Sequence, residues 1–425
     1  MNRSRLLILL MGALIVAAYG FKRWLWAPPG NQTYLSIEPR GRRSSLQDIE
    51  THFLVVAGGG SRASNEIALE KNVHYFQRTL AEMGINPSQA SVYFANGVTQ
   101  EPTVRYVKWG WERFKPPDIP HLIGPATAEN LSQWLQGVAR SQGSKHRCQA
   151  FMYFTGHGLL NRHNPDNNDL LLWDDQPLSV QQLAVQLDRL PPEKTFVTMM
   201  AQCYSGSFAN LIYRAGNPAE AVAPQTRCGF FATVKERPSV GCTPLVNEAD
   251  YEDYSSSFFA GLSGRDRTGN PVPSADYDGD GQVTFAEAHA FSKVDAQTPD
   301  WPVSTLEAWL HRQATAADIE DALSRPLAYW QDLASPEQRY VIVALAQALN
   351  YNLARSFQWN AEIAANGQEK SHVAYPERLR RQLITVAMTQ KVLQADDVST
   401  AAAISVFKRL HRCEHSTWWP QDEPN

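Results

Sequence analysis

Two short apolar runs constrain the fold of this 425-residue chain more than any other feature. The first begins at Ala150 and ends in a Gly-His-Gly sequence around His157, and the second begins at Thr195 and ends at Cys203, before a Ser-Gly-Ser turn. Each run has the length and composition of a buried strand. Because parallel strands of an open α/β sheet build their sites at one edge, we expect His157 and Cys203 to lie close together.

Strand and helix patterns alternate around these two runs. Further buried strands are predicted at 52–57, 91–95 and 229–234, and helices at 65–83, 128–140, 179–190 and 255–262. This alternation predicts an α/β fold with a mostly parallel sheet flanked by helices. We expect it to occupy residues 49–314, with an α-helical C-terminal extension at 315–425.

The N-terminal segment has the pattern of a targeting element. Arg3 and Arg5 precede an apolar run from Leu6 to Phe21, and two basic residues follow. The run is short for a membrane span and close to a signal-peptide core. Residues 1–26 are therefore predicted to be either a cleaved signal peptide or an uncleaved membrane anchor, and 27–48 a linker. Both alternatives predict an exported protein that is periplasmic, secreted or anchored in the inner membrane facing outside the cytoplasm.

Charge and glycine spacing argue against two other classes of partner. The formal net charge of −4 gives no reason to expect nucleic-acid binding. A Gly-Gly-Gly turn at 58–60 follows the first predicted strand, but it lacks the spacing of nucleotide-binding loops. We therefore expect no organic cofactor.

The five cysteines fit an oxidising compartment. Apart from Cys203, four remain, and they are enough for two disulfides. Cys228 and Cys242 flank a predicted hairpin and are the simplest pair, which would leave Cys148 with Cys413. Spacing alone does not fix the connectivity, and four reduced thiols are the alternative.

Cysteine and histidine together have the chemistry of nucleophilic catalysis. A Cys203 thiolate would attack a carbonyl carbon, with His157 as general base and then general acid. The backbone N–H groups of Gly158 and Cys203 would form the oxyanion hole. For either side chain alone, a structural role is the simpler interpretation. Their placement at the ends of two apolar strands favours catalysis.

The two motifs also resemble those of a known family. Tyr153-Phe-Thr-Gly-His-Gly158 and Ala201-Gln-Cys-Tyr-Ser-Gly206 are similar to the catalytic motifs of caspase-like cysteine peptidases, the group that contains caspases, metacaspases, legumain and the glycosylphosphatidylinositol transamidase. The resemblance covers about 51–304. It implies a caspase-like sheet and a cysteine-type endopeptidase, a hydrolase that cleaves protein or peptide substrates through a thioester on Cys203. Metacaspases usually have Asp where Ala201 stands here, and His where Tyr204 stands.

The resemblance leaves the cleavage specificity open. At positions where the family builds its substrate pocket, the charged candidates are Arg62, Glu236 and Asp253. Arg62 would suit an acidic side chain of the substrate, and either carboxylate would suit a basic one.

A separate motif at 276–287 predicts calcium binding. It matches the EF-hand loop, with oxygen ligands expected from Asp276, Asp278, Asp280, Gln282 through its carbonyl, Thr284 directly or through water, and Glu287. The residues before the loop are not helical in pattern, so we expect a single loop that holds a structural or activating calcium ion. An acidic, solvated turn is the alternative.

Three other functions are compatible with this sequence. A transpeptidase would use the same thioester with an amine as acceptor. A catalytically silent scaffold would use the helical C-terminal region for binding. A calcium-dependent adhesion module would rely on the Asp276 loop and export alone, and its binding would survive loss of Cys203.

Overall fold

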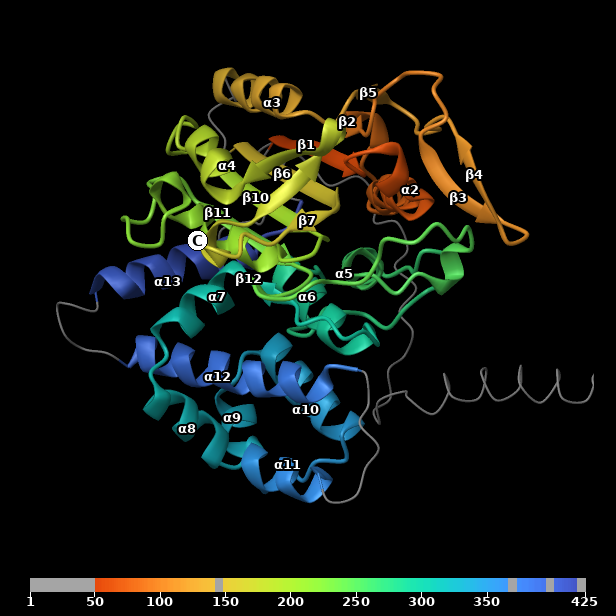
Figure 1. Cartoon of the computed structure of the whole chain (residues 1–425). Helices are drawn as coiled ribbons and strands as arrows, with labels where there is room; N and C mark the ends of the chain where they lie inside the picture. The colour runs from red at the N-terminus through yellow and green to blue at the C-terminus, as the bar shows by residue number, and fades with distance from the viewer. Residues whose placement is uncertain (1–49, 142–147, 366–372, 395–400, 419–425) are drawn as a thin grey trace, which may run out of the picture. The chain divides into compact units, whose positions relative to one another are not determined.

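The computed structural model describes residues 50–141, 148–365, 373–394 and 401–418, all within one compact unit (Figure 1). The predicted signal peptide or anchor at 1–26 and the predicted linker at 27–48 lie outside the described residues. In the described ranges, no helix is long and apolar enough to cross a membrane.

A seven-stranded sheet forms the centre of the fold, in the order β12-β11-β10-β6-β1-β2-β5. All neighbouring strands are parallel except β12, which pairs antiparallel with β11. The strands are β1 (Glu50–Gly58), β2 (Ala90–Phe94), β5 (Leu122–Gly124), β6 (Cys148–Gly156), β10 (Thr195–Met200), β11 (Arg227–Phe231) and β12 (Val303–Ser304). The predicted α/β fold with a mostly parallel sheet is therefore confirmed.

Alternating side chains of the strands bury both faces of the sheet. In β1, Phe53 and Val55 face one core, whereas Leu54 and Val56 face the other. Helices α2 (Ile67–Glu82), α5 (Tyr254–Ser263) and α6 (Phe285–Asp295) cover the first face. Helices α3 (Ala128–Arg140) and α4 (Val180–Leu187) cover the second (Figure 1). Continuous apolar strands of this kind are typical of a parallel sheet with helices on both sides.

Two small antiparallel sheets are added to this frame. Strands β3 (Val104–Lys108) and β4 (Trp111–Lys115) form a hairpin, and β7 (Gly158–Leu159), β8 (Asp169–Leu172) and β9 (Gln176–Ser179) form a three-stranded sheet. The hairpin lies between the predicted strand at 91–95 and the predicted helix at 128–140. The three-stranded sheet begins directly after His157.

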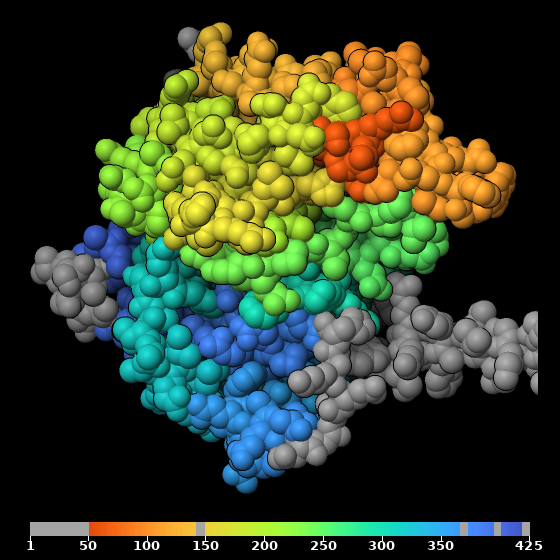
Figure 2. All heavy atoms as spheres, in the orientation of Figure 1, coloured from red at the N-terminus to blue at the C-terminus, as the bar shows by residue number. Residues whose placement is uncertain are grey.

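The predicted C-terminal helical region is present and packs against the sheet domain. It contains α7 (Thr305–Gln313), α8 (Ala316–Ser324), α9 (Leu327–Leu333), α10 (Pro336–Ala348), α11 (Phe357–Ala365), α12 (Tyr375–Leu393) and α13 (Ala401–Glu414). Helix α10 contacts α6, and α13 contacts β11. In Figure 2 this cyan-to-blue part lies directly against the green part of the chain. Pro326 separates α8 from α9, because proline lacks the N–H that would continue a helix.

The disulfide pairing differs from the expected one. Cys228 is bonded to Cys413, with 6.1 Å between their Cα atoms, and Cys242 is a free thiol. The predicted Cys228–Cys242 pair and its complement, Cys148 with Cys413, are therefore wrong. The reason is the direction of the β11 side chains. Cys228 points into the same buried core as the last turn of α13, whereas Cys242 lies exposed on a different segment.

Candidate active site

The two sequence motifs meet at one edge of the sheet. Strands β6 and β10 are parallel neighbours, with Phe154 opposite Met200, and His157 and Cys203 follow their carboxyl ends. A Cβ atom built on Gly158 would lie only 2.0 Å from the carbonyl oxygen of Cys203. Only glycine permits so close an approach of the two backbones. The predicted proximity of the two motifs is therefore found in the structure.

A sharp turn presents Cys203 at the end of its strand. Tyr204 adopts the left-handed conformation, with φ of 59°, and a 3-10 helix at Ser205–Ile212 follows at once. Such a backbone is uncommon outside glycine and is found at functional turns. Cys203 itself is half-buried, so its sulfur is not enclosed in the core.

Hydrogen bonds determine which nitrogen of His157 carries the proton. Its Nε2 atom lies 2.9 Å from the carbonyl oxygen of Ser64 and 3.0 Å from Oε2 of Glu66. A carbonyl oxygen can only accept, so Nε2 must donate. In the neutral ring the lone pair is then on Nδ1. This is the nitrogen that can take a proton from a nucleophile.

Glu66 is a partner of His157 that the sequence did not reveal. It is buried at the start of α2, and Arg105 donates to its Oε1 at 2.7 Å. Burial raises the pKa of Glu66, but the hydrogen bonds from His157 and Arg105 outweigh burial and leave the pKa below its usual value. Glu66 is therefore ionised at neutral pH, directly beside the imidazole. A carboxylate in this position orients the base, as the third group of a catalytic triad does.

The residues from 236 to 245, here called the covering segment, lie over the edge of the sheet at Cys203. Ser239 donates its N–H to Sγ of Cys203 at 3.3 Å, and the carbonyl of Arg237 accepts from Tyr204 N at 2.8 Å. Asp300 accepts from Val240 N at 3.1 Å. These bonds hold the segment in place across the cysteine.

Cys242 brings a second thiol to the site. Atoms of Glu66, His157 and Cys242 lie within 4.8 Å of one another. Burial lowers the pKa of His157, but its interactions with Cys242 and Glu66 act in the opposite direction and leave the pKa above its usual value. Burial around the sulfur raises the pKa of Cys242, and the nearby histidine opposes this. The interaction with Cys242 and the ionised Glu66 therefore both favour the protonated form of His157.

The predicted oxyanion donors lie at the junction of the motifs. The N–H of Cys203 has no hydrogen-bond acceptor among the residues that the structure describes. Gly158 is the first residue of β7 and lies against the Cys203 carbonyl. Free backbone N–H groups beside a nucleophile are the donors that a tetrahedral intermediate needs.

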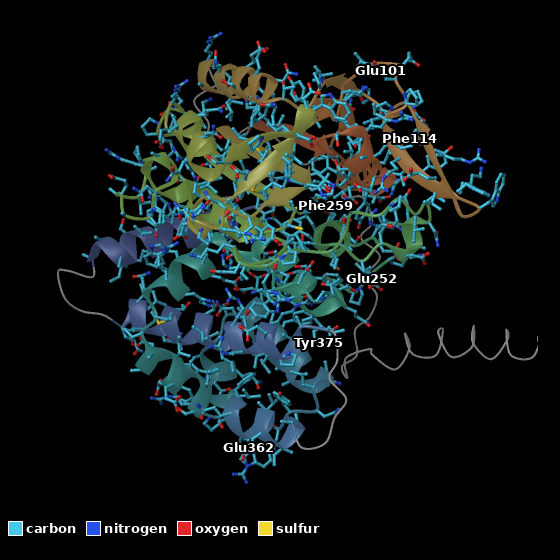
Figure 3. All side chains as sticks on the ribbon, viewed as in Figure 1. Glu101, Phe114, Glu252, Phe259, Glu362 and Tyr375 are labelled. Atoms are coloured by element: carbon cyan, nitrogen blue, oxygen red, sulfur yellow. A yellow bond between two sulfur atoms is a disulfide. The ribbon has the colours of Figure 1, made fainter. Side chains whose placement is uncertain are left out.

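The three charged candidates for a substrate pocket lie in different settings. The Arg62 guanidinium is stacked over the ring of Phe114, at 3.9 Å from its centroid, and Figure 3 labels Phe114 on the β3–β4 hairpin. Glu236 is exposed on the covering segment, with its carboxylate 3.8 Å from Lys235 Nζ. Arg62 and Glu236 therefore remain accessible to a ligand.

Asp253, in contrast, is taken up by interactions within the protein. Its carboxylate accepts from Ser256 N at 2.9 Å at the start of α5, from Asn72 at 2.7 Å, and from Arg267 at 3.3 Å. The side chain is only 3% exposed, and the covering segment lies against it at Gly241. The carboxylate of Asp253 is therefore already paired within the protein, unlike Arg62 and Glu236.

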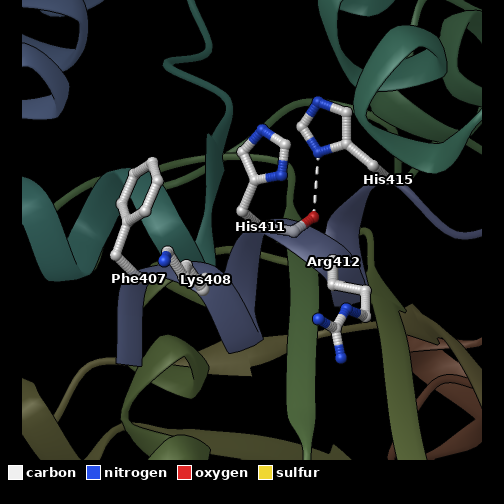
Figure 4. Close-up of a pocket in the computed structure, with 5 residues that line it drawn as sticks. All are labelled: Phe407, Lys408, His411, Arg412 and His415. Atoms are coloured by element: carbon white, nitrogen blue, oxygen red, sulfur yellow. Dashed lines mark hydrogen bonds between the residues drawn. The ribbon is translucent and has the colours of Figure 1, made fainter. Parts of the chain in front are cut away.

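Two cavities lie in the helical region rather than at the sheet edge. One of about 390 Å³ is lined by Phe407, Lys408, His411, Arg412 and His415 (Figure 4). In it the rings of His411 and His415 stack with their centroids 3.8 Å apart. The other, of about 310 Å³, lies among residues of α6, α7, α10, α12 and α13. Neither cavity is lined by Cys203 or His157.

The Asp276 loop has the geometry of a cation-binding turn. Oxygen atoms of Asp276, Asp278 and Asp280 lie within 4.8 Å of one another. The carboxylate of Asp276 accepts from the backbone N–H groups of Gly279 and Gly281, at 2.8 and 3.0 Å. Gly281 has a φ of 86°, which glycine adopts without strain. Three of the predicted calcium ligands are thus brought together.

The remaining predicted ligands lie at the start of α6. Thr284 and Glu287 cap this helix reciprocally, with Glu287 N donating to Thr284 Oγ1 at 3.3 Å and Thr284 N donating to Glu287 Oε2 at 2.8 Å. Oε1 of Glu287 accepts from Tyr277 N at 2.8 Å, beside Asp276. The carboxylate therefore reaches the loop, and Gln282 lies between the two groups in the sequence.

Comparisons with known proteins give no functional parallel. No protein-family model matches the chain, and no curated protein matches it. The chain is similar to the crystal structure of protein GSU0716 from Geobacter sulfurreducens, with a TM-score of 0.36 and 12% identity over 60% of this chain and 92% of that one. A similarity at this level carries no argument about what the chain does. The structure itself establishes an α/β fold with a mostly parallel sheet and C-terminal helices.

Proposed function

We propose that this protein is an exported cysteine-type endopeptidase with Cys203 as nucleophile and His157 as general base and acid. The observation that carries the proposal is the hydrogen bonding of His157. Because Ser64 and Glu66 accept from Nε2–H, Nδ1 is the nitrogen that would take the proton of Cys203, the thiol that follows the neighbouring strand. The resemblance of the two motifs to those of caspase-like peptidases supports the same conclusion.

The proposed reaction proceeds through a thioester. His157 takes the proton of Cys203 to form an imidazolium, the state that its raised pKa favours, and the thiolate attacks the carbonyl carbon of a peptide bond. The backbone N–H of Cys203, with that of Gly158, would donate to the oxygen that gains negative charge. His157 then protonates the leaving amine, and water hydrolyses the thioester. An amine in place of water would make the same protein a transpeptidase.

The test is covalent labelling of the full-length chain. Peptide acyloxymethyl ketones with Asp, Asn, Arg or Lys at the reactive end are offered to the wild type and to Cys203→Ala. We expect labelling by one class of probe and none in the variant. Products formed with and without an added amine then separate hydrolysis from transfer. The absence of labelling by all probes would favour the silent scaffold.

We also propose that the loop 276–287 binds calcium. Support comes from the three convergent aspartates and from Glu287, whose carboxylate reaches Tyr277 N within the loop. Oxygen ligands of this number and charge suit Ca²⁺ rather than a softer metal. The ion would tie the loop to the start of α6 and stabilise that part of the fold.

Calcium titration by calorimetry tests this second proposal. Asp278→Asn removes one ligand charge and should weaken binding at least about tenfold. Asp332→Asn, an exposed acid on α9, is the matched control and should bind as the wild type does. Equal affinity in the two variants would show that the loop is only an acidic turn. Labelling of Cys203 with and without calcium then tells a structural ion from an activating one.

A further inference from the structure

The covering segment brings three metal-ligating side chains together beside the proposed dyad. One atom each from Glu66, His157 and Cys242 lie within 4.8 Å of one another. Only His157 belongs to the two sequence motifs. Glu66 comes from the start of α2 and Cys242 from the covering segment, so the group exists only when that segment lies over the sheet edge.

We propose that Glu66, His157 and Cys242 bind a zinc ion, and that this ion reversibly blocks the active site. Thiolate, imidazole and carboxylate are the three ligand types that zinc takes in proteins. A thiolate ligand favours a soft or borderline ion over calcium or magnesium. Around a tetrahedral zinc ion, such ligand atoms are roughly 3.4 to 3.6 Å apart. The three ligand atoms, now within 4.8 Å of one another, would therefore need to approach by about 1 Å to bind the ion.

The surroundings of the three ligands favour a divalent cation. Oε1 of Glu66 is neutralised by Arg105, whereas Oε2 faces His157. Once an incoming ion has displaced the protons of Cys242 and His157, the thiolate and the Glu66 carboxylate face it with two negative charges, one of which Arg105 balances. The residue Cys242 is exposed although protein atoms surround its sulfur, so an ion would enter from the solvent side of this residue.

Zinc binding and base catalysis exclude one another at His157. Glu66 faces Nε2, so an ion shared with Glu66 would displace the Nε2 proton and use the lone pair of that nitrogen. A neutral imidazole has one nitrogen lone pair, so Nδ1 would then carry the ring proton and could not take one from Cys203. The ion also fastens Cys242, and with it the covering segment, to the sheet edge. The inhibitory part of this inference rests on the proposed function, whereas binding of the ion does not.

Cobalt substitution tests the site without any measurement of activity. The full-length chain is titrated with Co²⁺, and sulfur-to-cobalt charge-transfer absorption reports a thiolate ligand. Cys242→Ser and Cys203→Ala are a matched pair, since each removes one thiol at the sheet edge and only the first removes a ligand. Zinc affinity is then measured by competition against bound cobalt.

We expect one cobalt ion with charge-transfer absorption in the wild type and in Cys203→Ala. Cys242→Ser should lose that absorption and bind zinc at least about tenfold more weakly. Glu66→Gln should keep the absorption but also bind more weakly. Absence of the absorption in the wild type, or an unchanged spectrum in Cys242→Ser, would overturn the proposal.

Probe labelling separates this inference from the proposed function. Zinc should suppress labelling of Cys203 in the wild type and not in Cys242→Ser. If cobalt binds as expected but no probe labels the protein, the zinc site is retained and the proposed peptidase activity is rejected. Labelling of the wild type that is unaffected by saturating zinc would overturn the inhibitory role.

Discussion

Nε2 of His157 lies 3.0 Å from Oε2 of Glu66, although 91 positions separate the two residues in the sequence. The carboxylate is ionised and shares the Nε2–H of His157 with the carbonyl of Ser64. Together these two acceptors fix the ring and its tautomer. Glu66 therefore acts as a positioning residue for the proposed base.

Glu66→Gln should slow the labelling of Cys203 by up to about a hundredfold, because a misplaced base loses its alignment with the nucleophile. Glu112→Gln is the matched control. Glu112 also pairs with Arg105, at 3.2 Å, whereas the hydrogen bonds of the His157 ring in the described part of the chain go to Ser64 and Glu66. The measurement is the second-order rate constant of labelling, determined for both variants over the same series of probe concentrations. Equal rates for the two variants would show that Glu66 has no positioning role.

Gly158→Ala should disrupt the junction of the two motifs. The added Cβ would lie 2.0 Å from the Cys203 carbonyl oxygen, and neither backbone can move without shifting its strand. We expect a loss of about 1 to 3 kcal/mol in the free energy of unfolding, measured in urea, together with loss of labelling.

Gly137→Ala provides the control for this substitution. Gly137 lies within α3, and its added Cβ would meet nothing within 4 Å. Alanine there should stabilise the helix by about 0.5 to 1 kcal/mol. If Gly158→Ala behaved like this helical glycine, the close approach of the two motifs would not exist in solution.

The sheet and the pairing of the motifs followed from local pattern. The run from Phe196 to Met200 is buried at every position and apolar at all but Thr198, which is typical of a strand buried on both faces. Once the strands are parallel neighbours, the residues that follow them must share an edge. His157 and Cys203 could therefore be placed together without knowledge of any contact.

Long-range packing, rather than local pattern, decides three features of the site and the core. These are the contact of Glu66 with His157, the position of Cys242 and the disulfide partner of Cys228. Glu66 lies in a turn that precedes a helix, and nothing in its neighbourhood distinguishes it from a surface carboxylate. Cys242 reaches His157 only because the covering segment crosses the sheet edge. Cys413 meets Cys228 only because α13 returns to β11 across 185 residues. No spacing in the sequence encodes these returns.

Reduction of the Cys228–Cys413 disulfide should lower the free energy of unfolding by about 2 to 5 kcal/mol. The bond ties α13 to the central sheet, so its loss widens the unfolded ensemble. Urea unfolding with and without a reductant measures the change. Cys242→Ser should show the same change, because Cys242 is a free thiol. If the stability of Cys242→Ser no longer changed on addition of the reductant, Cys242 would have to take part in the disulfide.

Stability should fall as the pH rises because of Glu414. Burial raises the pKa of this carboxyl to about 8, although Leu306 N donates to it at 2.6 Å. A raised folded-state pKa contributes stability that is complete below the unfolded value of the carboxyl and is lost as the pH rises through about 8.

The uncharged Glu414→Gln variant should lack this pH-dependent contribution to the free energy of unfolding. Its urea midpoint, compared with that of the wild type from about pH 5 to about pH 9, should therefore decline less. Parallel curves for the two proteins would show that Glu414 does not titrate in this way.

Identification of the sulfur that a peptide probe modifies tests the central claim most directly, because two free thiols lie at the sheet edge. The full-length chain is labelled with the acyloxymethyl ketone that reacts fastest, and the modified residue is found by peptide mass spectrometry. The account predicts the adduct on Cys203, with labelling lost in His157→Ala and retained in Cys242→Ser. An adduct on Cys242, with Cys203 unmodified, would contradict it.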